Sequence, residues 1–339
     1  MASLPPLTAN VRRTVHRIVD VLRKNKTFFL TGHERPDGDT IGSELALGGY
    51  LKSIGKKVTI ANVGPVPDIY RFLPNVRSVR TTPRAAGYFD VAVVFECSGA
   101  DRTGHILDFD RQAGTVINID HHIHHGMYGD INLIDAGASS NSEQLCQVFD
   151  LAGHSLTKAE ATALYVGLVT DTGRFQQENT RPQSHRVAAH LMEAGVNVAD
   201  VFRHIYATRS VPALKLMSRA LGSLTMAAQG RVAVMRLTRS DFVQTGAQED
   251  DTEDVVNQGL LPASSWVSVF LREVENGKKV KVSLRGKGRI DLCRLAVSFG
   301  GGGHKNASGV TLDGSVDQVE VKILKALAME MPRKSKQWQ

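Results

Sequence analysis

Short apolar runs alternate with amphipathic segments along the first half of the chain. Strand-length apolar runs occupy residues 27–31, 57–62, 91–96 and 115–119. Apolar residues recur at helical spacing over residues 11–23, with Asn10 as the expected cap, and over residues 41–53, 142–151 and 158–169. Strands that alternate with helices are typical of a mostly parallel, helix-flanked sheet, so we expect an α/β domain over residues 10–185.

The pattern changes after residue 180. Residues 181–218 carry a helical pattern throughout, from which we expect a helical connector over residues 186–218. Beyond it, strands are expected at residues 224–228, 232–237, 266–272 and 279–284, and helices at residues 291–297 and 316–331. This order predicts a smaller C-terminal α/β domain with a mixed sheet over residues 219–332, followed by a loose basic tail over residues 333–339.

Length and composition agree with two globular domains. The chain has 339 residues, of which 42% are hydrophobic and 22% charged, which excludes a mostly disordered protein. No apolar run approaches the roughly 18 residues of a membrane span, and the charged N-terminus lacks the apolar stretch of an export signal. Three cysteines without metal-type spacing argue against a disulfide scaffold or a zinc ribbon. We therefore expect a cytoplasmic enzyme or binding protein with no membrane partner.

Positive charge is concentrated in the C-terminal part of the chain. The net charge is +7, and residues 211–339 carry 19 Lys and Arg against 13 Asp and Glu. Residues 272–305 alone contain nine of these basic side chains. A positive segment of this density suits an anionic partner such as a phosphate chain. The alternative is a solvated strand edge whose lysines discourage aggregation.

Clusters of acidic residues and histidines follow three of the expected strands. The sequence GHERPDGDTIGS follows the first strand and brings His33, Asp37 and Asp39 into one turn that precedes a helix. The third strand ends at Glu96, and the fourth is followed by Asp120, His121 and His122. Ligands gather at the carboxyl ends of strands in such sheets. The alternatives are an Asp-rich turn with a helix cap, a local hydrogen-bond acceptor at Glu96 and a solvated His-rich loop.

A further carboxylate, Asp171 in GLVTDTGRF, stands at the end of an expected helix, where a capping residue is the alternative. Together these groups form a ligand set of carboxylate oxygens with two imidazoles. Such a set suits two Mn²⁺ or Mg²⁺ ions better than a thiol-rich zinc site. Paired cations of this kind activate water and stabilise the attacking and leaving oxygens of phosphoryl transfer.

The segment GGGGHKNASG, residues 300–309, has four glycines before His304. Glycines let backbone amides approach an anion closely, and the basic strand that ends near Arg285 lies just upstream. An arginine and a glycine-rich turn therefore suggest a phosphate clamp, with a flexible hairpin as the alternative. The segment lacks the lysine placement of a P-loop, which argues against a P-loop nucleotidase.

These motifs, in this order, resemble those of the DHH phosphoesterases. GHERPDGDTIGS, VVFECSGADRTG, DHHIHHG and GLVTDTGRF resemble the motifs of the catalytic domain, and VSLRGKGRIDLCRLAVSFGGGGHKNASG resembles the DHH-associated C-terminal domain. Within the family, the chain resembles most the bifunctional oligoribonucleases and pAp phosphatases. The resemblance implies exonucleolytic hydrolysis of short RNA to mononucleotides and of 3′-phosphoadenosine 5′-phosphate to AMP. It also implies two divalent cations, Mn²⁺ preferred and Mg²⁺ or Co²⁺ as substitutes, and a homodimer.

The resemblance assigns roles to matching positions. One metal ion would be bound by His33 and Asp37, and the other by Asp39, His121 and Asp171, with Glu96 bridging them. Asp120 would orient His121, and His122 would contact the scissile phosphate. In the C-terminal domain, the substrate's phosphates or terminal base would be held by Arg285, Gly301, Gly302, Gly303 and His304.

Two positions depart from the family pattern. The bridging residue is usually Asp and is Glu96 here, and the usual Arg-Ser pair is Arg285-Gly286. The first change lengthens the bridging carboxylate by one methylene, and the second removes one hydroxyl donor. Two further enzyme classes on the same scaffold stay open, a linear dinucleotide (pApA-type) phosphodiesterase and a manganese pyrophosphatase. A catalytically weak nucleic-acid-binding protein is the alternative that Glu96 favours.

Overall fold

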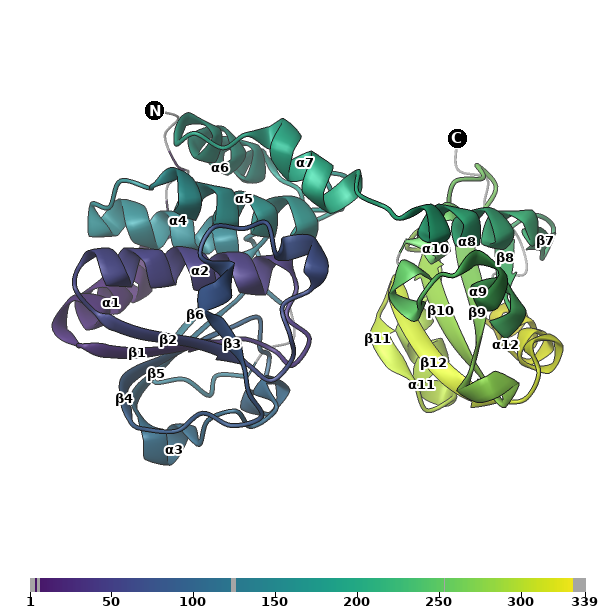
Figure 1. Cartoon of the computed structure of the whole chain (residues 1–339), viewed down its shortest axis with the longest axis horizontal. Coiled ribbons are helices and arrows are strands. Elements are labelled where there is room, and N and C mark those ends of the chain that lie inside the picture. Colours follow the sequence, from purple (N-terminus) through teal and green to yellow (C-terminus); the bar gives the residue numbers. More distant parts are fainter. Residues whose placement is uncertain (1–3, 5–6, 123–125, 253, 332–339) are drawn as a thin grey trace. The chain divides into compact units, whose positions relative to one another are not determined.

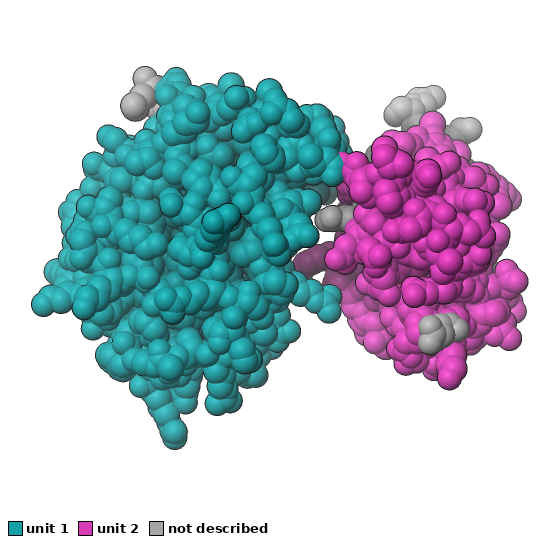
Figure 2. Space-filling model, viewed as in Figure 1, with its two compact units in different colours: residues 1–208 teal, residues 209–339 magenta. Residues whose placement is uncertain are grey.

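The computed structural model describes residues 4, 7–122, 126–252 and 254–331. The chain forms two compact units, Met1–Thr208 and Arg209–Gln339, coloured separately in Figure 2. The division between them falls inside the segment 186–218 that the sequence predicts as a connector. The predicted tail, residues 333–339, lies outside the described residues. None of the helices in the described ranges is both long and apolar enough to cross a membrane.

Unit 1 is built on a six-stranded sheet in the order β3-β2-β1-β4-β5-β6, in which all neighbouring strands run parallel. Its strands are β1 (Thr27–Thr31), β2 (Lys57–Asn62), β3 (Val79–Thr81), β4 (Phe89–Phe95), β5 (Ala113–Asp120) and β6 (Ile131–Ile134). The predicted helix-flanked parallel sheet is confirmed. The short edge strands β3 and β6 were not predicted, because three or four residues show no recognisable period.

Helices cover the two faces of this sheet unequally. Phe28 and Leu30 of β1 point to the face packed by the long helices, whereas Phe29 points to the opposite face with Ile106 and Leu107. Figure 1 shows the long helices together on one side and the short α3 on the other. The helices are α1 (Ala9–Lys24), α2 (Gly38–Ser53), α3 (Phe109–Gln112), α4 (Asn141–Ala152) and α5 (Lys158–Asp171).

Two local details explain how these helices begin and pack. The cap of α1 is Thr8, whose hydroxyl accepts from the Val11 amide, so the prediction of Asn10 was wrong by two residues. Both residue types cap helices well, and only the backbone conformation distinguishes them. The close packing of α2 on α5 depends on Gly42, where an added Cβ would lie 2.3 Å from the Ala163 carbonyl oxygen.

The prediction of helix throughout residues 181–218 was wrong. Three helices occupy this range: α6 (Pro182–Glu193), α7 (Val198–Tyr206) and α8 (Val211–Gly222). The first break contains Gly195 at φ +101°, and new helices start at the caps Asn197 and Ser210. The apolar spacing continues across both breaks, so periodicity alone could not locate them, whereas the Gly and Asn are recognised stop and start residues.

Unit 2 contains a second six-stranded sheet in the order β11-β12-β10-β9-β8-β7. Its strands are β7 (Thr225–Ala227), β8 (Val232–Leu237), β9 (Val267–Val274), β10 (Lys279–Gly286), β11 (Gly302–His304) and β12 (Ala307–Asp313). Only the β8–β9 pair is parallel among these described strands, which confirms the predicted mixed sheet. The glycine-rich segment forms the β11–β12 hairpin.

The sheet of unit 2 separates two apolar clusters. One lies against α11 (Leu292–Ser298) and α12 (Val316–Glu330) and includes Val280, Val282 and Leu284 of β10. The other lies against α8, α9 (Arg239–Thr245) and α10 (Val255–Gln258). Short 3₁₀ helices complete the structure at η1 (Asp68–Tyr70), η2 (Val76–Ser78), η3 (Ala100–Thr103), η4 (Glu249–Thr252) and η5 (Glu275–Gly277).

Candidate metal centre

The carboxyl ends of β1, β4 and β5 lie next to one another in the sheet of unit 1. Thr31 of β1 pairs with Val94 of β4, and Phe95 of β4 pairs with Ile119 of β5. The loops that follow these three strands therefore start side by side. They carry the predicted site residues His33, Glu96, His121 and His122, so the sheet order itself brings the three motifs together.

His121 lies at the middle of the resulting cluster. Its Nε2 atom is 3.3 Å from Oε1 of Glu96 and 3.2 Å from Oδ2 of Asp171. The Nδ1 atom of His122 is 3.6 Å from Oε2 of Glu96. Two groups have ligand atoms within 4.8 Å of one another: Glu96 with His121 and His122, and Asp39 with His121 and Asp171. Residues from α2, α5 and two strand ends thus converge on one place, where their carboxylates and imidazoles could hold divalent cations.

Glu96 is held in this cluster by a strained backbone. Its φ of +58° lies in the left-handed region, and its side chain is 1% exposed. Oε1 of Glu96 and Nε2 of His121 are both buried without a hydrogen-bond partner in the described chain. Strain and unpartnered polar atoms are costly and occur together at functional sites. A divalent cation between these atoms would satisfy both, and the set of carboxylates and imidazoles is one that Mn²⁺ or Mg²⁺ accepts.

The electrostatics of the cluster also favour a cation. Burial, together with the negative charges of Asp39 and Asp37, raises the pKa of Glu96 well above its usual range. Burial likewise raises the pKa of Asp171, although the neighbouring His121 ring acts in the opposite direction. Carboxylates crowded in this way repel one another when ionised, so a bound positive charge would stabilise their ionised forms.

Asp39 serves the architecture as well as the cluster. It is fully buried, and its carboxylate accepts hydrogen bonds from the Asn141 amide (2.6 Å), the Ser142 amide (2.9 Å) and the Ser142 hydroxyl (2.6 Å). An added Cβ on Gly167 of α5 would lie 2.4 Å from Asp39 Oδ1. The start of α4 and a glycine of α5 therefore position this ligand. Sequence reasoning missed Asn141, Ser142 and Gly167, because their role depends on contacts across the fold.

His33 and Asp37 form a pair beside the cluster. The Nε2 atom of His33 lies 3.6 Å from Oδ2 of Asp37, while Oδ1 of Asp37 accepts from the Asp39 and Thr40 amides as the cap of α2. Burial acts to raise the pKa of Asp37, but the contact with His33 and the hydrogen bond from the Thr40 amide outweigh it and lower that pKa. The capping and ligand interpretations are thus compatible, since each uses a different oxygen of the carboxylate.

Asp120 contacts the ring of His122 rather than the ring of His121. Its Oδ1 lies 2.7 Å from His122 Nδ1 and accepts the backbone amides of His121 at 2.8 Å and His122 at 3.2 Å. Burial acts to raise the pKa of Asp120, but the hydrogen bond and charge of His122 outweigh it and lower that pKa. The position of His121 is therefore supported through its backbone, and the orientation of His122 through its ring.

Sequence reasoning also missed a buried pair under the first motif. Glu44 is fully buried, and its Oε2 accepts from Asn62 Nδ2 at 2.9 Å. Oδ1 of Asn62 in turn accepts from the Gly32 amide at 2.9 Å and the Thr31 hydroxyl at 3.2 Å. This chain of hydrogen bonds supports the turn immediately before His33. In the sequence, the one indication of this pair is the presence of Glu44 within a largely apolar helical segment.

The predicted substrate-binding residues of unit 2 occupy one end of its sheet. Arg285 of β10 pairs with Ala307 of β12, which pairs with His304 of β11. Arg285 is half-buried, and burial lowers the pKa of its guanidinium. The Gly301 amide donates to the Ala296 carbonyl, and an added Cβ on Gly303 would lie 2.5 Å from the Ala307 carbonyl oxygen. Glycine at these positions therefore permits close packing of the hairpin.

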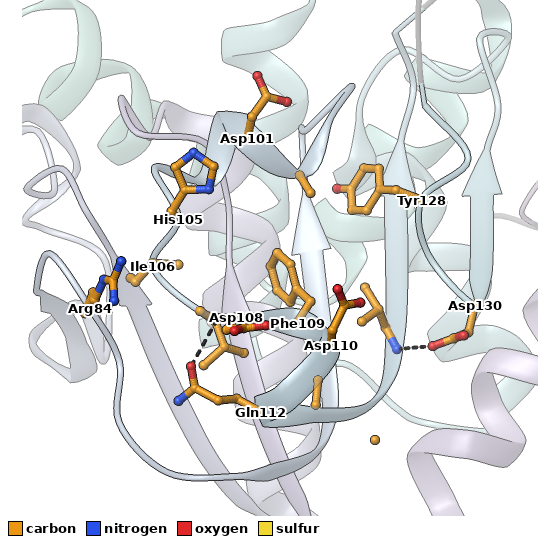
Figure 3. A pocket seen from close by; sticks show the side chains of 15 residues that line it. Arg84, Asp101, His105, Ile106, Asp108, Phe109, Asp110, Gln112, Tyr128 and Asp130 are labelled. Atoms are coloured by element: carbon orange, nitrogen blue, oxygen red, sulfur yellow. Dashed lines mark hydrogen bonds between the residues drawn. The ribbon is translucent and has the colours of Figure 1, made fainter.

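A cavity of about 660 Å³ elsewhere in unit 1 contains none of the predicted ligands. Figure 3 shows its walls, which include Arg84, His105 and several aspartates, among them Asp108 and Asp110 of the α3 region. Because its lining residues come from residues 84–130 and none comes from α2 or α5, we distinguish it from the metal centre.

Residues 27–168 match the DHH family, N-terminal domain, and residues 229–331 match the DHHA1 domain. A relative from Thermus thermophilus is 32% identical over 306 residues, covering 90% of each chain. The chain belongs to the DHH family. The Thermus relative is named bifunctional oligoribonuclease and PAP phosphatase NrnA, as is a Bacillus subtilis protein that is 27% identical over 84% of this chain and 89% of its own.

Structural similarity agrees with this membership. The crystal structure of an exopolyphosphatase-related protein from Bacteroides fragilis superimposes with a TM-score of 0.88 at 27% identity, covering 94% of this chain and 98% of that chain. DHH phosphoesterases use divalent metals, so the cluster of Asp39, Glu96, His121 and Asp171 is the expected place for them in this DHH domain. The resemblance identified from the motifs is confirmed.

Proposed function

We propose that this DHH-family hydrolase is a divalent-metal-dependent exoribonuclease that degrades short oligoribonucleotides to mononucleotides and converts 3′-phosphoadenosine 5′-phosphate to AMP. The observation that carries the proposal is the convergence of Asp39, Glu96, His121 and Asp171 around buried atoms that have no hydrogen-bond partner in the described chain. The names of the Thermus and Bacillus relatives support the substrate class.

In the proposed site, His33 and Asp37 would hold one ion, and Asp39, His121 and Asp171 would hold the other. Glu96 would be a ligand for both, and Mn²⁺ would be the preferred ion. When bound, such ions activate water and neutralise charge that develops on the phosphate oxygens. Glu96 stands where the family usually has Asp, and its backbone is left-handed, with a φ of +58°.

His122 and Asp120 supply the protein's own contribution to the reaction. The Asp120 carboxylate, 2.7 Å from Nδ1 of His122, fixes the orientation of that ring. The Nε2–H of that ring then donates a hydrogen bond to a non-bridging oxygen of the scissile phosphate. Such a donor strengthens as negative charge grows on that oxygen, so it stabilises the transition state more than the bound substrate.

Unit 2 also contributes substrate-binding residues in this proposal. Arg285 and His304, with the backbone of Gly301, Gly302 and Gly303, hold the terminal phosphates or base. Arg285 offers a fork of N–H donors that matches phosphate oxygens. The protein is further expected to be a homodimer, which sedimentation velocity would test.

A substrate panel tests the function. Purified protein is incubated with RNA of two to five nucleotides, with 3′-phosphoadenosine 5′-phosphate, with linear pApA and with pyrophosphate, each in Mn²⁺, Mg²⁺ or Co²⁺. Release of mononucleotides from RNA and of AMP from the bisphosphate supports the proposal. Turnover of pyrophosphate or pApA alone would assign one of the other two enzyme classes. Binding of RNA without any product under all three ions would indicate a nucleic-acid-binding protein.

A further inference from the structure

Two arginine side chains of unit 2 make cation–π contacts with the ring of Trp266. The guanidinium carbon of Arg231 lies 4.5 Å from the ring centroid, and that of Arg289 lies 4.3 Å from it. Both guanidinium groups therefore lie within cation–π distance of this one ring. Contacts of this kind restrict two long, flexible side chains.

The charges of this stack are not compensated. Among the described residues, no carboxylate forms an ion pair with Arg231, Arg289 or the neighbouring Lys287. Asp291 follows closely in sequence, but its carboxylate accepts from the Arg294 amide as the cap of α11. A cluster that only stabilises the fold does not require unpaired positive charge. Unpaired positive charge of this kind favours the binding of a polyanion.

In the sheet, the stack lies next to Arg285, one of the proposed phosphate-binding residues. The Lys287 amide donates to the Trp266 carbonyl, and the Trp266 amide donates to the Arg231 carbonyl. These three residues thus extend the sheet past Arg285, which pairs with Ser268 on β9. We call Arg231, Trp266, Lys287 and Arg289 the basic edge. It continues directly from the end of the sheet where Arg285 and His304 lie, so one phosphate chain could reach both.

We propose that the basic edge binds the phosphate backbone and bases of oligoribonucleotides that extend beyond the terminal nucleotide held at Arg285. This inference rests on the function proposed above and specifies its substrate range. Bases stack on the guanidinium of Arg289, whose side chain is exposed. The positive charges of Lys287 and Arg231 then attract the phosphate backbone of the RNA. The bisphosphate 3′-phosphoadenosine 5′-phosphate is too short to reach the basic edge.

A charge-reversal pair with a matched control tests the edge. Lys287→Glu with Arg289→Glu changes two exposed side chains of the edge, and Lys322→Glu with Lys325→Glu makes the same charge change on the exposed surface of α12. We expect the edge variant to raise KM for five-nucleotide RNA by about tenfold, with kcat and the KM for 3′-phosphoadenosine 5′-phosphate unchanged. The slope of log affinity against log salt should fall by about 1.4 for two lost contacts to a single strand. The α12 variant should match the unmodified protein.

The opposing results are equally specific. An unchanged KM for the five-nucleotide RNA, or an equal rise in the α12 control, would overturn the basic edge as a binding surface. An equal rise for 3′-phosphoadenosine 5′-phosphate would place these residues in the terminal subsite and also overturn it. If the unmodified protein cleaves neither substrate, the proposed function fails by itself. In that case, fluorescence anisotropy of labelled five-nucleotide RNA tests the basic edge, by comparing the RNA affinity of the edge variant with that of the α12 variant.

Discussion

Asp120 Oδ1 lies 2.7 Å from the Nδ1 atom of His122, and the same oxygen accepts hydrogen bonds from the backbone amides of His121 and His122. One buried carboxylate thereby shapes the turn after β5 and sets the orientation of one ring. This arrangement explains why an aspartate precedes the two histidines: its negative charge and its acceptor geometry are both used.

Asp120→Asn should lower kcat by about 100-fold while the protein stays folded. The amide keeps an oxygen that can accept from the backbone but loses the carboxylate's charge-assisted contact with the His122 ring, and supporting partners of this kind are worth about 10–100-fold. Steady-state kinetics with 3′-phosphoadenosine 5′-phosphate and circular dichroism provide the measurement. Asp110→Asn, at an exposed position of α3, is the control. An Asp120→Asn enzyme within twofold of the unmodified one would contradict the role of this carboxylate.

Divalent ions should stabilise unit 1 through Glu96. At 100 times its dissociation constant, Mn²⁺ adds about 2.7 kcal/mol to the free energy of unfolding, a rise in Tm of about 5–10 °C for a domain of this size. Glu96→Gln should abolish most of this rise. In chelator, the same variant should unfold at a higher temperature than the unmodified protein, because it removes one of several mutually repelling carboxylates. Thermal scans with EDTA and with Mn²⁺ measure both effects, and an equal Mn²⁺-induced shift in the two proteins would refute the assignment.

Glu44→Gln should make the protein less sensitive to pH. Burial raises the pKa of Glu44 well above the value of 4.5 expected in the unfolded chain, although the hydrogen bond from Asn62 acts in the opposite direction. Below pH 4.5 both states are protonated, so the group's contribution to stability is fully present there. As pH rises from that value towards the folded pKa, only the unfolded state ionises, and stability falls by at most about 1.4 kcal/mol per pH unit.

Urea unfolding in EDTA at several pH values measures this effect. The difference in unfolding free energy between Glu44→Gln and the unmodified protein should be flat below pH 4.5 and should then grow in favour of the variant. Gln keeps an oxygen for the Asn62 amide, so the hydrogen bond that supports the Gly32 turn is preserved. A difference that does not vary with pH would show that Glu44 titrates normally.

Two neighbouring glycines of the GGGGH segment should respond differently to alanine. A Cβ on Gly301 would lie 2.3 Å from the Gly309 carbonyl oxygen, whereas a Cβ on Gly302 would meet nothing within 4 Å. We expect Gly301→Ala to cost about 1–3 kcal/mol of unfolding free energy and Gly302→Ala to stay within about 0.5 kcal/mol. Denaturant titration of the two variants compares them directly. Equal losses in both would show that the backbone conformation, not the close approach of β12, requires glycine here.

Predictions from sequence succeeded where the relevant information is local. The strand at Thr27–Thr31 and that at Lys57–Asn62 were bounded correctly, because short apolar runs stand between polar turns. They failed at the break around Gly195 and at the edge strands β3 and β6, where the apolar period is uninterrupted or too short to recognise. The cap of α1 was misplaced because Thr8 and Asn10 are chemically equivalent candidates.

The sequence by itself determined the α/β class, the parallel sheet and the placement of Glu96, His121 and His122 at strand ends, since hydrophobic period and chain order decide all three. Only the tertiary structure decided that Asp39 would be held by the start of α4, more than 100 residues away, and that Glu44 would pair with Asn62. It also decided that Arg231 and Arg289 would make cation–π contacts with the Trp266 ring. Such contacts join residues distant in the chain, and no local pattern encodes them, because they exist only once helices and strands have packed.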